Sequence, residues 1–230
     1  MKRGYRRTMA RITAEPDEVL RRADPILGSI IERVVRENGG VRLTVPPDPT
    51  VPADPNVPTD HYGMLIRAIV SQNISIIAST ALYQRLGERF GGRPPTPEEI
   101  LEDDPDELRM AAGLSRAKTT ALYSLAEHIV SGELDLQRLH ELPDDDVVTQ
   151  LVAVKGVGNW TAHMFLMFHL HRPDVLPVGD LEIRRCVQIE YRLPELPRSA
   201  DLIRIAETWR PYRTLACMYL WQVAHTTARL

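Results

Sequence analysis

The feature that most constrains this fold is the stretch of residues 151–185, in which two apolar segments flank a turn with two glycines. One predicted helix ends near residue 154, Gly156 and Gly158 make the turn, and Asn159 begins a strongly apolar second helix. Glycine allows positive φ and close backbone approach, so the first amides of the second helix can face a ligand. Because a helix N-terminus favours anions, the stretch predicts either a phosphate-binding hairpin or a plain turn between helices.

Most of the remaining chain shows the apolar spacing of helices. Asp60 is placed to cap one helix, and Pro25 interrupts the first helical segment, residues 16–37. The last helix is predicted over residues 210–227. Only residues 41–43 show an alternation that would suit a strand. The sequence therefore predicts an all-α protein.

Six prolines between residues 45 and 58 exclude regular helix and predict a stiff connection between two lobes. We expect one helical lobe, residues 60–172, to contain the hairpin. Residues 16–59 and 173–230 would form the second lobe. Residues 1–15 are a basic tail that is either solvated or a weak DNA-contacting arm.

Charge and composition narrow the class of protein. The formal net charge is -3, and acidic residues outnumber basic ones over residues 60–172, so any DNA footprint must be local. Cys186 and Cys217 lie in apolar helical patterns and are expected to be buried free thiols. No apolar run approaches the ~18 residues of a membrane span, and no signal peptide is evident. We therefore expect no membrane association and a cytoplasmic protein, nucleoid-associated if bacterial.

Five stretches in order resemble the helix-hairpin-helix DNA glycosylase superfamily, and within it the 3-methyladenine DNA glycosylase II (AlkA-type) branch, in the form without the N-terminal β-domain. The matching stretches are residues 67–75, 112–118, 154–162, 176–180 and 209–213. The resemblance covers about residues 17 to 225. It implies two helical lobes with a helix-hairpin-helix motif and a cleft between them.

The resemblance also implies the activity. It points to a monomeric glycosylase that hydrolyses the N-glycosidic bond of alkylated bases, of the 3-methyladenine type, in duplex DNA during base excision repair. Pocket shape decides the substrate, so a glycosylase for hypoxanthine, ethenoadenine or uracil is an alternative. The second alternative is a non-catalytic helix-hairpin-helix protein that only binds DNA.

Asp180 is the candidate catalytic residue. It is placed to cap the helix that follows, and a helix N-terminus favours the anion. A carboxylate suits N-glycosidic cleavage because the sugar builds positive charge as the base departs. By its position in residues 176–180, the resemblance assigns Asp180 as the catalytic aspartate.

The identity of residue 160 distinguishes glycosylases that only hydrolyse the base from those that also cut the strand, and here the residue is Trp160. In relatives that also cut the strand, a lysine stands at this place and forms a Schiff base; here Lys155 precedes Gly156, on the wrong side of the turn. The resemblance therefore implies a hydrolase without lyase activity. It also implies a base pocket, because an extruded alkylpurine needs aromatic surface and a cationic base is attracted to indole. The implied pocket residues are Trp160, Trp221, Met164 and Tyr62, while Trp209 is expected in the core.

The resemblance implies three further sets of site residues. Asn73, with Gln72 beside it, would be the wedge that fills the space of the flipped nucleotide, although a structural break in a helix is the alternative. The DNA phosphate would be bound by Gly156, Gly158, Trp160 and Thr161. A Na+ or K+ ion would bind the backbone carbonyls of Val152, Val154 and Val157. No other cofactor is expected: two cysteines cannot supply the four-cysteine iron–sulfur loop of some relatives, and His163, His169 and His171 form no metal-ligand set.

Overall fold

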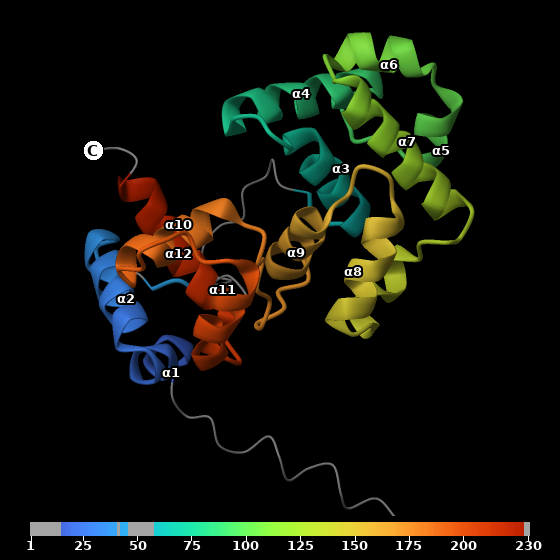
Figure 1. Cartoon of the computed structure of the whole chain (residues 1–230). Coiled ribbons are helices and arrows are strands. Elements are labelled where there is room, and N and C mark those ends of the chain that lie inside the picture. Colours follow the sequence, from blue (N-terminus) through green and yellow to red (C-terminus); the bar gives the residue numbers. More distant parts are fainter. Residues whose placement is uncertain (1–14, 41, 46–57, 228–230) are drawn as a thin grey trace, which may run out of the picture. The chain divides into compact units, whose positions relative to one another are not determined.

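The computed structural model describes residues 15–40, 42–45 and 58–227, and over these residues it is helical with no strand (Figure 1). The all-α prediction is confirmed. The helices are α1 Pro16–Ala23, α2 Pro25–Glu37, α3 His61–Ser71, α4 Ile76–Arg89, α5 Pro97–Glu102, α6 Pro105–Ala112, α7 Arg116–Val130, α8 Asp144–Ala153, α9 Asn159–Phe168, α10 Leu181–Glu190, α11 Ser199–Ala206 and α12 Arg213–Thr227. Two 3-10 turns, η1 Leu136–Glu141 and η2 Glu207–Trp209, lie between them. No described helix is long and apolar enough to cross a membrane.

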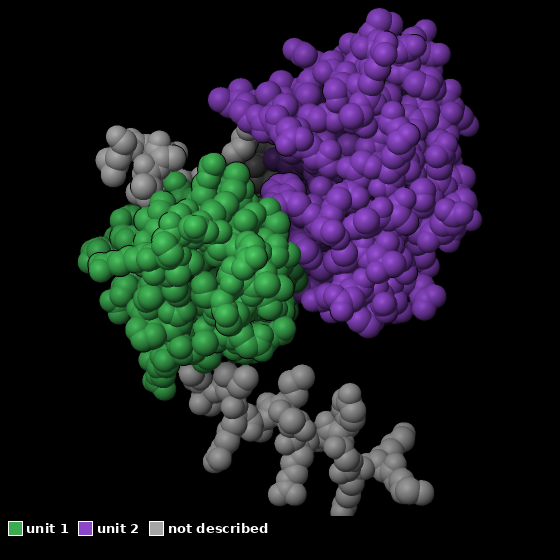
Figure 2. Space-filling view, viewed as in Figure 1, with its two compact units in different colours: residues 1–48, 173–230 green, residues 49–172 purple. Residues whose placement is uncertain are grey.

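The chain divides into two compact units (Figure 2). Unit 1 comprises Met1–Asp48 and Pro173–Leu230, and unit 2 comprises Pro49–Arg172. The predicted division had its first boundary at residue 60, whereas unit 2 begins before it. A Cβ added at Gly63 would lie 2.7 Å from the Cβ of Pro58, so Pro58 packs against the first turn of α3. The basic tail up to residue 14 and the proline-rich residues 46–57 lie outside the described residues.

Helix α3 provides the centre of unit 2. Its apolar residues Leu65, Ile66, Ile69 and Val70 are fully buried, and the helix packs against α4, α7 and α9. Asp60 caps it as predicted, accepting a hydrogen bond from the Gly63 amide at 2.8 Å. The end of α3 and the start of α9 are thereby held in one packed body.

Asp24 joins the two sequence-distant parts of unit 1. One carboxylate oxygen caps α2 by accepting hydrogen bonds from the amides of Ile26 and Leu27, at 3.0 and 3.1 Å. The other accepts from the indole Nε1 of Trp209 at 2.9 Å and from the hydroxyl of Tyr191 at 2.5 Å. Trp209 is fully buried, which confirms its place in the core. A single carboxylate therefore satisfies donors from α2, α10 and the segment before α12.

Asp24→Ala should lower the free energy of unfolding by about 2–4 kcal/mol, because it removes a helix cap and leaves the buried indole N–H of Trp209 without its acceptor. Urea unfolding of the full chain measures the change. Asp104→Ala is the matched control, since Asp104 caps α6 from an exposed position and its loss should cost about 0.5–2 kcal/mol. Equal losses in the two variants would contradict a joining role for Asp24.

Three local predictions can be compared with the structure. Cys186 and Cys217 are buried free thiols, as predicted. The last helix begins at Arg213 and not at Arg210, because Arg210 and Pro211 form a turn after η2. The Arg210 guanidinium donates to Asp174 at 2.5 Å. Residues 42–45 form no strand; the Leu43 amide donates instead to the Tyr219 hydroxyl at 3.2 Å.

Candidate functional site

The predicted hairpin is present between α8 and α9. Gly156 has φ +87°, and a Cβ there would lie 2.7 Å from the Cβ of Ala121 on α7. The Lys155 amide donates to the Ser124 hydroxyl at 3.0 Å, which attaches the turn to α7 a second time. Gly158 differs, since it has negative φ and nothing lies within 4 Å of its Cβ position. Only Gly156 is therefore required to be glycine by the packing of the turn.

The start of α9 has the character of an anion site. Its N-cap is Gly158, which has no side chain to accept from the first helical amides, and its first turn carries no acidic residue. Gly156, Gly158 and Trp160 are exposed, as phosphate contact requires. Thr161 is only 3% exposed and its hydroxyl accepts a hydrogen bond from Gln72, so that hydroxyl faces the protein interior. The backbone of residues 156–160, more than the Thr161 side chain, is thus available to a ligand.

The three carbonyls predicted to hold a monovalent cation lie around the C-terminal end of α8. The Val154 carbonyl already accepts a hydrogen bond from the Val157 amide at 3.0 Å, which leaves it one further lone pair. Neutral carbonyl oxygens are the type of ligand that a hard cation such as Na+ or K+ takes, and the ion at Val152, Val154 and Val157 stays a prediction from the resemblance. Among the described residues, no group of three or more His, Cys, Asp or Glu side chains is arranged for a metal.

The loop after α3 is attached to the hairpin by Gln72. The side-chain amide of Gln72 donates to the Gly156 carbonyl at 3.0 Å and to the Thr161 hydroxyl at 3.2 Å. Beside it, Asn73 is exposed and has φ +56°. From the opposite side, the buried Lys118 ammonium donates to the Val70 carbonyl at 2.7 Å, and burial lowers the pKa of this lysine. The structure therefore brings the predicted wedge and phosphate residues together in unit 2, a contact that the sequence did not predict.

Asp180 caps α10, as predicted. Its Oδ1 accepts a hydrogen bond from the Ile183 amide at 2.9 Å, and the indole Nε1 of Trp221 on α12 donates to the same atom at 3.3 Å. The carboxylate is 7% exposed. Two of the predicted site residues of unit 1 are thus in direct contact, and the carboxylate orientation is fixed by a helix start and an indole.

The other predicted pocket residues belong to unit 2. Trp160 lies in the first turn of α9 and is 48% exposed, and the half-buried Met164 follows on the same face one turn later. Tyr62 lies in the first turn of α3: burial raises its pKa, and the negative charges of Glu98 and Glu99 on α5 raise it further. Trp160 and Met164 therefore share one face of α9, whereas Tyr62 belongs to α3.

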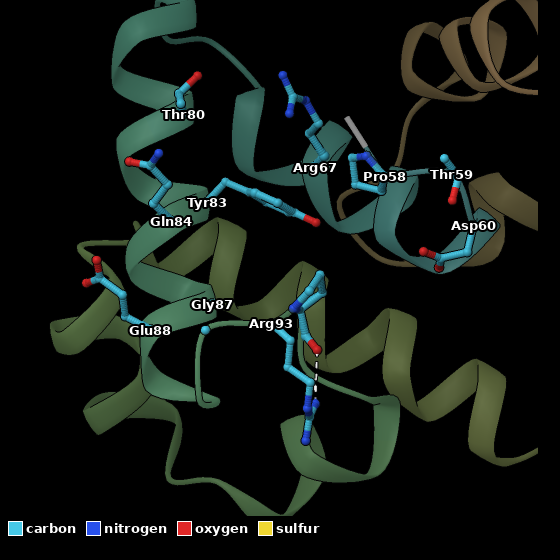
Figure 3. A pocket seen from close by; sticks show the side chains of 12 residues that line it. Pro58, Thr59, Asp60, Arg67, Thr80, Tyr83, Gln84, Gly87, Glu88 and Arg93 are labelled. Atoms are coloured by element: carbon cyan, nitrogen blue, oxygen red, sulfur yellow. Dashed lines mark hydrogen bonds between the residues drawn. The ribbon is translucent and has the colours of Figure 1, made fainter. Parts of the chain in front are cut away.

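A groove of about 710 Å³ lies between α3, α4 and the segment before α5 (Figure 3). Tyr83 extends from α4 across it, with the Arg67 guanidinium 5.9 Å from the centre of its ring. The Tyr83 hydroxyl is buried and makes no hydrogen bond to any other described residue. None of the predicted site residues is among the described residues that line this groove.

Two histidines join α3 to the end of α9. The Nδ1 atom of His61 lies 2.5 Å from the Nε2 atom of His169, and both rings pack edgewise or tilted against Phe165. Burial lowers the pKa of both, that of His169 to about 4. Both rings are therefore neutral at pH 7, and the N–H of one donates a hydrogen bond to the bare ring nitrogen of the other.

This pair predicts a loss of stability in acid. Since the pKa of His169 is lower in the folded state than its ordinary value of 6.5, the unfolded state binds more protons between about pH 6.5 and pH 4. The free energy of unfolding should be constant above that window and should fall as the pH decreases through it. Urea unfolding at pH 7.5, 6.0 and 5.0 measures the slope, which should be smaller in His169→Gln. A slope unchanged by this substitution would assign the acid sensitivity to other groups.

Comparisons with known proteins agree with this geometry. Residues 66–211 match the HhH-GPD superfamily of base excision DNA repair proteins. The DNA-3-methyladenine glycosylase 1 of Schizosaccharomyces pombe is 37% identical over 71% of this chain and 72% of its own length.

Two solved structures share the fold. The DNA-3-methyladenine glycosidase of Bacillus halodurans matches with a TM-score of 0.75 and 34% identity, over 94% of this chain and 92% of the other. The S. pombe 3-methyladenine DNA glycosylase in complex with abasic DNA matches with a TM-score of 0.68 and 31% identity, over 91% and 97%. The hairpin, the helix-capping Asp180 and these matches together show that this chain belongs to the HhH-GPD superfamily of base excision DNA repair proteins.

Proposed function

We propose that this chain is a monofunctional DNA glycosylase that hydrolyses the N-glycosidic bond of alkylated bases of the 3-methyladenine type in duplex DNA. The observation that carries the proposal is Asp180, a largely buried carboxylate fixed by the α10 N-terminus and the Trp221 indole. The family is a base excision repair family, and the relatives above are named for 3-methyladenine.

In this reaction the bond between C1′ of the sugar and the base nitrogen breaks, and its electron pair leaves with the base. Positive charge develops on the sugar, and the negative charge of Asp180 stabilises it. A water oxygen then bonds to C1′ and releases its proton to solvent, leaving an abasic site. The Trp221 indole, which contacts Asp180 within unit 1, would supply aromatic surface to the extruded base, and an alkylpurine cation is attracted to an indole face.

The absence of strand cleavage is supported by where the lysines lie. The chain has three, Lys2, Lys118 and Lys155, and Lys2 is outside the described residues. The Lys118 ammonium is buried on the Val70 carbonyl, and Lys155 precedes Gly156 in the hairpin, whereas the exposed position at the start of α9 is Trp160. A Schiff base needs an accessible, deprotonated amine next to C1′. The proposal therefore includes water, and not an amine, as the nucleophile, and needs no redox cofactor.

Base release from methylated duplex DNA tests the proposal. Released 3-methyladenine and 7-methylguanine are resolved by chromatography, and a parallel reaction contains borohydride to trap a covalent complex. We expect release of at least one alkylated base with no trapped complex. A trapped complex would exclude the monofunctional mechanism. Release of only hypoxanthine, ethenoadenine or uracil, from duplexes that contain one of these bases, would show that the substrate is that base and not an alkylated one.

A further inference from the structure

Two apolar side chains next to Asn73 are unusually exposed. Ile77, in the first turn of α4, is 85% exposed, the largest value among the big apolar side chains of the described residues. Ile74, on the other side of the helix cap Ser75, is 38% exposed. Single exposed apolar residues are common on protein surfaces, but two of them at one loop-helix junction form a patch that indicates contact with a partner.

The local structure gives Ile74 no conventional packing role. A residue directly before a helix cap often packs against the fourth residue of the helix when that residue is also apolar. In α4 the fourth residue is Ser79, so the apolar pair of this motif is missing. The side chains of Ile74 and Ile77 are thus available to a partner outside the chain.

The position of this junction is fixed relative to the hairpin. Gln72 holds the loop to the Gly156 carbonyl and the Thr161 hydroxyl, and Lys118 holds the end of α3 from behind. The apolar patch and the predicted phosphate contacts are therefore parts of one surface of unit 2, and a strand bound at the hairpin would bring a duplex to Ile74 and Ile77.

The charge of this surface also suits DNA. The first turns of α4 and α9 carry no acidic residue. The first turns of α5, α6 and α8 each carry two or three. Phosphate groups would be repelled from those three helix starts and not from α4 or α9. The first turns of α3 and α7 are also free of acidic residues, and Gln72 connects the loop before α4 to the hairpin before α9.

We propose that Ile74 and Ile77 form a second wedge, which enters the duplex beside Asn73 and stacks on the base pair next to the flipped nucleotide. The proposal rests on the proposed function. Asn73 is polar, and its amide recovers little of the stacking lost when a nucleotide leaves the helix, whereas apolar side chains inserted at a base step recover more. The isoleucines supply that apolar surface.

The test compares Ile74→Ala/Ile77→Ala with Met110→Ala, which truncates a 66% exposed apolar side chain on α6 in the same unit. Each protein is titrated into a duplex with a tetrahydrofuran abasic analogue and 2-aminopurine as the adjacent base, which reports insertion at that step by a change in fluorescence. Base release from methylated duplex DNA is measured alongside. Unfolding curves are recorded for each protein, because Ile74 is only 38% exposed and its truncation removes buried surface, and binding is compared at a temperature at which all the proteins are folded.

The double variant should bind the abasic duplex about tenfold more weakly and lose most of the 2-aminopurine response, while Met110→Ala matches the wild type. Unchanged binding and fluorescence would overturn the second wedge even if the wild type releases alkylated bases. A wild type that releases no base but shows this loss in the double variant would instead overturn the proposed function and retain the wedge. If the wild type is a dimer, the double variant is a monomer and DNA binding is unchanged, the patch binds a second copy of the chain. That result would also overturn the second wedge.

Discussion

Asp180→Asn is expected to lower the rate of base release at least about 100-fold, because it removes the negative charge that stabilises the developing positive charge on the sugar. The asparagine oxygen can still accept from the Ile183 amide and from the Trp221 indole, so the cap of α10 and the orientation of the side chain are kept. Binding of duplex DNA and the free energy of unfolding should stay close to the wild-type values.

Single-turnover base release, fluorescence anisotropy with an abasic-analogue duplex and urea unfolding separate these effects. Asp104→Asn is the matched control, since it makes the same change at the N-cap of α6 and should leave all three unchanged. An Asp180→Asn variant that loses DNA binding and stability in parallel with activity would show that the aspartate is structural. Retained activity would remove Asp180 from the mechanism.

Gly156→Ala is expected to lower the free energy of unfolding by about 2–5 kcal/mol, the combined cost of a left-handed alanine and of overpacking against α7. The added methyl group would lie 2.7 Å from the Cβ of Ala121, so either the turn or α7 must move. Movement of the turn would also shift the Gly156 carbonyl away from Gln72. We therefore expect weaker binding of the abasic duplex in addition to the loss of stability.

Gly158→Ala provides the comparison within the same hairpin, because a methyl group there meets nothing within 4 Å and the backbone has φ −101°. It should change the free energy of unfolding by less than about 1 kcal/mol. Equal destabilisation by the two substitutions would contradict the packing argument. DNA binding by a Gly156→Ala protein that is still folded at the assay temperature would test whether the shifted turn alone weakens phosphate contact.

The sequence predicted the elements whose causes are local. Asp60 and Asp180 cap helices because a carboxylate at that position accepts hydrogen bonds from amides two or three residues ahead. Helix α8 ends just before the glycines of the hairpin. The start of α12 was placed three residues too early, since Arg210 and Pro211 form a turn and an apolar pattern alone does not fix a helix boundary to the residue.

The contacts that the sequence did not predict join residues far apart in the chain. Gln72 reaches Gly156 across 84 positions and Trp221 reaches Asp180 across 41. No local periodicity or spacing encodes such pairs, and glutamine after a helix has several common uses. The resemblance places Gln72 in the DNA wedge, and in the structure its side-chain amide donates to the Gly156 carbonyl and to the buried Thr161 hydroxyl.

The carboxylate of Asp24 has a consequence for the order in which the chain acquires its structure during synthesis. Its partners Tyr191 and Trp209 follow it by 167 and 185 residues, so α1 and α2 leave the ribosome long before the helices that cover them. Unit 2 is continuous in sequence and can complete its core while the C-terminal helices are still being translated. The apolar faces of α1 and α2 therefore stay uncovered during synthesis until the helices that follow unit 2 have emerged.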